Sequence, residues 1–106
     1  MDPHAYKFAI KKIAKLISES KCQVDFLNVG GGFPSKYPNM NPQPLDKYFS
    51  VIRTEFLRSF GASSQTMMLS EPGRALVSNS MSLILRVDLR KKNNIYINDG
   101  VHGYLH

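Results

Sequence analysis

The chain has 106 residues, and its 14 lysine and arginine residues against 8 acidic residues give a formal net charge of +6. Its hydrophobic content of 42% is typical of a globular protein and excludes a disordered or fibrous chain. No apolar run approaches the ~20 residues that a membrane-spanning helix needs, and the first residues show no secretory pattern. We therefore expect a cytoplasmic protein without a membrane partner.

The single cysteine, Cys22, excludes an internal disulfide framework and fits a reducing compartment. We expect it to be a small buried hydrophobic residue, and we expect no metal site. The positive charge invites a nucleic-acid interpretation, but the basic residues are dispersed and lack interleaved aromatic residues. Four lysines share one side of the first predicted helix, where a solvated face explains them better: Lys7, Lys11, Lys12 and Lys15.

The first half of the chain predicts a helix, a strand, a loop and a second helix. Asp2 and Pro3 are a good helix start, and the helix should run to about Ser20. The short apolar run 24–29 predicts a parallel strand that is covered on both sides. A proline-rich surface loop follows, and a helix should begin at Leu45 and end at Gly61. The apolar side of the first helix should contain Tyr6, Ala9, Ile10, Ile13, Leu16 and Ile17.

The second half changes character near Met81. Residues 67–70 predict a short strand, and residues 75–80 a brief helical turn. Residues 83–89 and 95–97 then read as antiparallel strands joined by a turn. The αβαβ order of residues 1–80 indicates a parallel α/β sheet. We therefore predict an α/β domain in residues 1–80 and the beginning of an antiparallel β-domain in residues 81–106.

Two motifs lie where the predicted parallel strands end. Gly30-Gly31-Gly32 follows the first strand, and consecutive glycines expose backbone N–H groups that can bind an anion such as phosphate. Three glycines alone more often form a tight turn without a ligand. Glu71-Pro72-Gly73-Arg74 ends the next strand, and this second motif favours a ligand site at the rim of the sheet.

With a third motif, Tyr96-Ile97-Asn98-Asp99-Gly100-Val101, the chain resembles the ornithine/diaminopimelate/arginine decarboxylase family. These enzymes use pyridoxal 5′-phosphate (PLP) and share a (β/α)₈ barrel followed by a β-domain. The resemblance implies the C-terminal part of the barrel in residues 1–80 and the truncated β-domain in residues 81–106. The third motif and the proline-rich loop are most similar to bacterial ornithine or lysine/ornithine decarboxylases.

The resemblance also implies that essential parts of the family's active site lie outside this sequence. The family's Schiff-base lysine lies far upstream, and none of the lysines here matches its motif. A catalytic Cys-Asp pair and a phosphate-binding tyrosine lie beyond His106, and Met1 is not expected to be the native start. The 106-residue chain is therefore expected to be an inactive fragment of a homodimeric enzyme whose subunits share active sites.

By resemblance, Gly31 and Gly32 present backbone N–H groups to the PLP phosphate, while Gly30 serves the turn. Arg74 adds a charged fork to the phosphate, and Glu71 faces the pyridine nitrogen. The cofactor-binding residues implied by the resemblance are Gly31, Gly32, Glu71, Gly73 and Arg74, and Glu71 is also catalytic.

His102 stands where ornithine-type enzymes usually carry a tyrosine, in a segment that reaches the partner's active site. We interpret it as a substrate contact across the dimer or as a surface histidine. Asn28 replaces the aspartate that the family often has before the glycines. Both differences from the family concern the identity of the substrate more than the binding of the cofactor.

Three hypotheses for the function follow. The first is a PLP-dependent decarboxylase of a basic amino acid, with ornithine and putrescine formation ahead of diaminopimelate, lysine or arginine. The second is a non-catalytic, regulatory homologue of the same family. The third is a small module outside the family that binds a phosphate-bearing or nucleic-acid ligand through its glycine loop.

Overall fold

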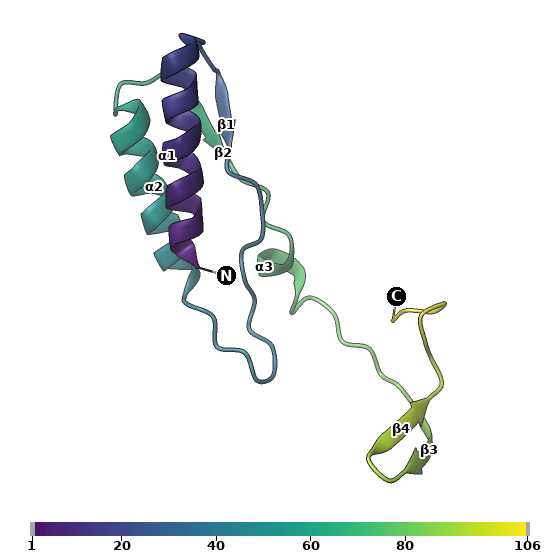
Figure 1. The fold of residues 1–106 in the computed structure, drawn as a ribbon. Helices are drawn as coiled ribbons and strands as arrows, with labels where there is room; N and C mark the ends of the chain where they lie inside the picture. Colours follow the sequence, from purple (N-terminus) through teal and green to yellow (C-terminus); the bar gives the residue numbers. More distant parts are fainter. Residues whose placement is uncertain (1, 106) are drawn as a thin grey trace.

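The structure is a computed structural model that describes residues 2–105. Two long helices lie side by side against a pair of short strands, and an extended segment leads from this unit to a β-hairpin (Figure 1). The radius of gyration is 20.2 Å, against about 13 Å for a compact chain of this size. The elements are α1 (Pro3–Ser20), β1 (Phe26–Asn28), α2 (Leu45–Phe60), β2 (Met67–Leu69), α3 (Arg74–Val77), β3 (Val87–Lys91) and β4 (Asn94–Ile97).

Helix α1 begins and ends as the sequence predicts. The side chain of Asp2 accepts a hydrogen bond from the His4 N–H at 2.9 Å, and Pro3 occupies the first turn. The apolar side is only partly covered, because α1 packs on α2 and Ile13 and Leu16 stay 42% and 53% exposed. Within the described residues, no helix has the length and apolar character needed to cross a membrane.

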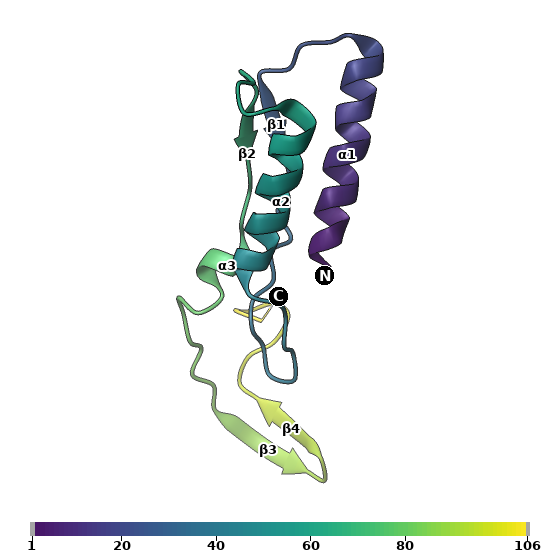
Figure 2. The same ribbon diagram turned by 90° about the vertical axis from the view of Figure 1, so that its left-hand side faces the viewer.

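Strands β1 and β2 pair in parallel, as the αβαβ order predicts, with α2 in the connection between them. Figure 2 shows both helices on the same side of these strands. The prediction that the first strand is covered on both sides is wrong, since Phe26 and its partner Met67 are each 58% exposed. The strand is also shorter than predicted, and its second face meets no other described layer.

The core lies between the helices and the strands and is largely aromatic. Tyr6 of α1 stacks on Phe33 with ring centroids 5.4 Å apart, and Tyr48 of α2 meets both rings edge-on. Phe33 is 1% exposed although it belongs to the loop after β1, so the core anchors this loop. Cys22, by contrast, is exposed, and the prediction that it is buried is wrong, because the link from α1 to β1 runs over the surface.

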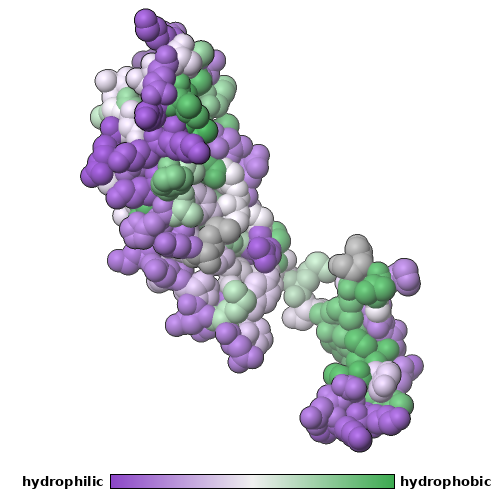
Figure 3. Space-filling view, in the orientation of Figure 1, coloured by the Kyte–Doolittle hydropathy of each residue, from purple (hydrophilic) through white to green (hydrophobic). Residues whose placement is uncertain are grey.

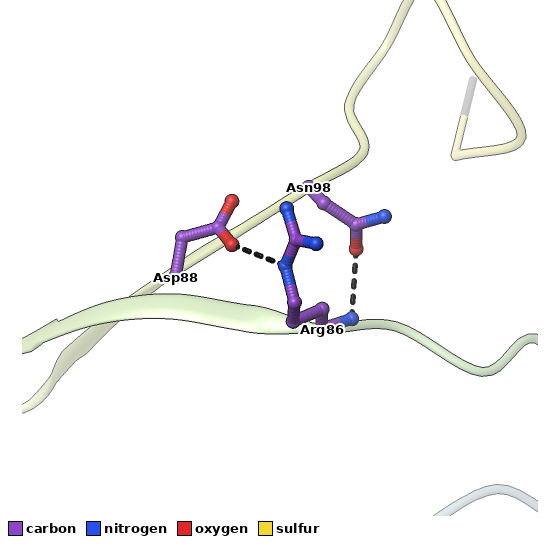
Figure 4. A network of polar contacts seen from close by, with 3 residues as sticks. All are labelled: Arg86, Asp88 and Asn98. Carbon is purple, nitrogen blue, oxygen red and sulfur yellow. Dashed lines mark hydrogen bonds and ion pairs between the residues drawn. The ribbon is translucent and has the colours of Figure 1, made fainter.

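Strands β3 and β4 form an antiparallel hairpin with Lys92 in the left-handed conformation at its turn. At its open end the Arg86 N–H donates to the Asn98 Oδ1 at 2.7 Å, and the Arg86 guanidinium pairs with Asp88 (Figure 4). Apolar side chains gather on the surface of this hairpin (Figure 3). They include Val87, Leu89, Ile95 and Tyr96, which are all more than half exposed. A division into two domains near Met81 stays a prediction.

Candidate functional site

The two motifs that follow β1 and β2 meet at one edge of the sheet. Parallel pairing brings the ends of both strands together, and the Glu71 N–H donates to the Gly30 carbonyl at 2.9 Å. A Cβ atom added to Gly31 would meet the backbone oxygen of Glu71, far inside van der Waals contact. Only glycine therefore lets the two loops approach this closely.

The backbone of the glycine loop has dihedral angles that residues other than glycine rarely adopt. Gly30 and Gly32 have φ angles of +75° and +83°, both in the left-handed region that favours glycine. No hydrogen bond from the Gly31 or Gly32 N–H is formed within residues 2–105. These N–H groups therefore have no acceptor among the described residues, and their role in binding a ligand stays a prediction.

The side chain of Asn28 joins both motifs. Its Oδ1 accepts a hydrogen bond from the Gly30 N–H at 2.8 Å, and its Nδ2 donates to the Glu71 Oε1 at 2.9 Å. Sequence reasoning treated Asn28 only as a replacement for an aspartate. Its position two residues before Gly30 is the spacing of an Asx-turn, which predicts the first contact but not the second.

Tyr6 of α1 also holds the glycine loop. Its hydroxyl donates to the Gly31 carbonyl, and its ring lies in the core between Phe33 and Tyr48. Burial, and secondarily the neighbouring Tyr48 hydroxyl, raise the pKa of Tyr6 above its usual value, so it remains a donor in mildly alkaline solution. Sequence reasoning counted Tyr6 among the apolar residues of a helix and missed this contact.

A serine links the glycine loop to the segment that carries Arg74. The Ser35 hydroxyl donates to the Arg74 carbonyl at 3.0 Å and lies 2.5 Å from the Ser78 hydroxyl. Arg74 opens α3 directly after Gly73, and its side chain is exposed. Among the described residues its guanidinium forms no ion pair and no side-chain hydrogen bond, so this cation is available to an anionic ligand.

His102 lies in a turn at the end of the hairpin unit. The Asp99 carboxylate shapes this turn by accepting from the Gly100 N–H at 2.8 Å and from the Tyr104 N–H. His102 is exposed, and within residues 2–105 no hydrogen bond or ion pair joins it to Glu71 or Arg74. The structure thus brings the first two motifs together and leaves the third apart. The same described range contains no cluster of His, Cys, Asp and Glu that could hold a metal ion.

The geometry brings the backbone N–H groups of the glycine loop and the Glu71 carboxylate to one edge of the sheet. The family model that matches residues 1–78 is described as the pyridoxal-dependent decarboxylase, pyridoxal binding domain. The chain belongs to this family, as the three motifs predicted.

Its relatives include ornithine decarboxylases from two yeasts. The chain is 33% identical to that of Schizosaccharomyces pombe, over 98% of this chain and 24% of the relative. It is 30% identical to that of Candida albicans, over 74% of this chain and 19% of the relative. It is also 27% identical to antizyme inhibitor 2 of Xenopus laevis, over 96% and 26% of the two chains. The chain thus spans about a quarter or less of the length of these relatives.

Proposed function

We propose that this chain belongs to a decarboxylase that acts on ornithine. In this proposal it forms the part of the PLP site that binds the phosphate and faces the ring nitrogen. The observation that carries the proposal is the hydrogen-bonded junction between the glycine loop and Glu71. It sets backbone donors and a carboxylate side by side, at the rim where parallel α/β folds bind ligands.

The residues fit the cofactor in three respects. The glycine loop carries N–H groups that take no acceptor within residues 2–105, and its φ angles need glycine at positions 30 and 32. The guanidinium of Arg74 is not engaged by the described part of the chain, and it follows Glu71 by three residues. Ser35 fixes the backbone of Arg74 relative to the loop, so both phosphate-binding parts belong to one unit.

In this proposal Gly31 and Gly32 bind phosphate oxygens through their N–H groups, Gly73 lets the chain turn toward the ligand, and Arg74 forms charge-assisted hydrogen bonds to the phosphate. PLP supplies the electron sink that decarboxylation requires. Glu71 holds a proton on the ring nitrogen, because an adjacent carboxylate favours the charged form of a base. Asn28 keeps the Glu71 carboxylate turned toward the glycine loop.

The substrate, the dimer and the compartment belong to the same proposal. The two yeast relatives are ornithine decarboxylases, which favours ornithine over diaminopimelate, lysine or arginine. A homodimer with shared sites would bring His102 to the partner's substrate, which is consistent with its exposure on a separate unit. An exposed thiol at Cys22 fits a reducing cytoplasm. The Schiff-base lysine would come from a segment outside these 106 residues.

A second candidate function is that of a non-catalytic regulator. It is favoured by the similarity to a relative named antizyme inhibitor 2, which covers 96% of this chain. The position of Glu71 beside the glycine loop and the unengaged guanidinium of Arg74 support the enzyme instead, because the proposed cofactor chemistry uses both groups. Membership in the family disfavours the third hypothesis, a separate nucleic-acid-binding module.

A chimera tests the proposal directly. Residues 1–106 replace the matching segment of the Schizosaccharomyces pombe ornithine decarboxylase, which supplies the remainder of the enzyme. We expect the chimera to retain PLP through gel filtration and to release CO₂ from ornithine. A chimera with the melting temperature of the parent enzyme but without bound PLP would contradict the proposal. Bound PLP without CO₂ release would favour the regulator.

A further inference from the structure

A cavity lies at the amino ends of β1 and β2, at the opposite edge of the sheet from the glycine loop. Its volume is about 340 Å³, within the range of small-molecule sites, and it is bordered by the links from α1 into β1 and from α2 into β2. Both links lie at the end of the helices that is far from α3 (Figure 1). We propose that this cavity binds an aliphatic ammonium ion through the carboxylate of Asp25, which lines it.

Two hydrogen bonds fix the walls of the cavity relative to each other. The Met67 N–H donates to the Asp25 carbonyl at 2.7 Å, and the Thr66 hydroxyl donates to the Val24 carbonyl at 2.8 Å. Both contacts follow from the parallel register, which pairs Phe26 with Met67 at the amino ends of the strands. The cavity is therefore built by the same strand pair as the proposed PLP site but does not overlap it.

Asp25 is the acidic residue for which the fold supplies no role. The chain has eight acidic residues. Six of them have a hydrogen-bond or ion-pair partner: Asp2, Glu19, Glu55, Glu71, Asp88 and Asp99. Asp46 lies in the first turn of α2, where the helix dipole favours a carboxylate. Within residues 2–105 the Asp25 carboxylate forms no ion pair and no hydrogen bond, so it is available to a cationic ligand.

The other walls favour an organic cation over a metal ion. Ile17 and Phe60 belong to the last turns of α1 and α2, where the helix dipoles carry partial negative charge that attracts a cation. Together with Val24 they also add apolar surface, which suits an alkyl chain. A divalent metal ion requires several oxygen ligands, whereas Asp25 is the one charged side chain among the described residues that line the cavity.

The product of the proposed reaction belongs to this class of ligand. Ornithine loses its carboxylate as CO₂ and takes up a proton at the same carbon, which gives putrescine, an alkyl chain with an ammonium group at each end. The carboxylate of ornithine would be repelled by Asp25 and by the helix ends, so the cavity favours the product over the substrate. This link to the product rests on the proposed function, whereas the binding of an alkyl ammonium ion does not.

Equilibrium dialysis of the 106-residue chain with putrescine tests the binding. We expect a Kd of about 1 mM, because an exposed ion pair and two helix ends each contribute little. Asp25→Asn should weaken the binding about threefold to fivefold. Asp46→Asn removes the same charge from the first turn of α2 and should bind as the unsubstituted chain does. Equal affinities in all three chains would overturn the proposal.

The single cysteine allows a second test that requires no substitution. Cys22 lines the cavity, is exposed and is the one thiol of the chain, so iodoacetate or iodoacetamide modifies this position alone. The two products are nearly equal in size, but only the carboxymethyl group is negatively charged. The carboxymethylated chain should bind putrescine about threefold more tightly than the carbamidomethylated chain, and equal affinities would overturn the proposal. Neither measurement needs bound PLP or turnover, so a chimera without PLP would contradict the proposed function and leave this result unaffected.

Discussion

The prediction that tests the junction most sharply is Gly31→Ala. The added methyl group would collide with the backbone oxygen of Glu71, an atom that no side-chain rotation can move away. Overpacking of this kind costs about 1–3 kcal/mol. The displacement would also break the hydrogen bond from the Glu71 N–H to the Gly30 carbonyl, which adds about 1 kcal/mol. We expect a loss of about 2–4 kcal/mol in the free energy of unfolding.

Two other glycines provide graded controls. Gly30→Ala meets no atom within 4 Å but keeps a φ of +75°, so it should cost about 1–2 kcal/mol. Gly100→Ala meets no atom within 4 Å and has no positive φ, so it should be nearly neutral. Urea unfolding followed by circular dichroism gives the three values. If Gly31→Ala were no more destabilising than Gly30→Ala, the close approach of the two loops would not exist in solution.

The remaining predictions concern the cofactor and the core. In the chimera, Arg74→Ala should weaken PLP binding by about 2–3 kcal/mol, because a charged hydrogen bond is lost. Equilibrium dialysis measures the affinity for PLP, and an unchanged affinity would refute the contact between Arg74 and the phosphate. Glu71→Ala should lower kcat more than PLP affinity, and released PLP with an intact kcat would refute its role. Residues 1–106 alone, supplied with PLP and ornithine, should release no more CO₂ than free PLP does. The pKa of Tyr6 is raised on folding, so its stabilisation is complete below the unfolded value of 10.0 and is lost as pH rises through the folded value. Tyr6→Phe should remove this alkaline component of the urea midpoint, and an identical alkaline slope would contradict it.

The local elements of the fold could be predicted from the sequence because their signals are local. Asp2 and Pro3 determine the start of α1, and Gly61, with its φ of +85°, ends α2. The parallel pairing of β1 with β2 followed from the helix between them. Once the strands are parallel, motifs at their carboxyl ends must meet, so the site could be placed before its contacts were known.

The contacts that hold the site together could not be predicted, because they join residues far apart in the sequence. The Nδ2 of Asn28 meets Glu71 across 43 positions, and Tyr6 meets Gly31 across 25. Each contact depends on the register of Phe26 with Met67 and on the place where α1 lies, and neither is encoded in a local pattern. The prediction that Cys22 is buried was wrong for a related reason. The hydrophobic character of a residue does not say which layers of the structure are present to cover it.

A glycine in a motif can be required for ligand binding or for the close approach of two backbone segments. Sequence reasoning did not distinguish these two reasons, and the structure does. Gly31 was assigned to the phosphate by resemblance to the family, yet the Glu71 carbonyl excludes a Cβ there with or without a ligand. Loss of PLP in Gly31→Ala would therefore not show that Gly31 binds phosphate, since the same change separates the two loops. The Arg74 side chain forms no hydrogen bond or ion pair with the described residues, so a substitution there reports on the ligand alone. The assignment of the phosphate to this edge of the sheet is thus tested by substituting Arg74, and the assembly of the edge is tested by substituting Gly31.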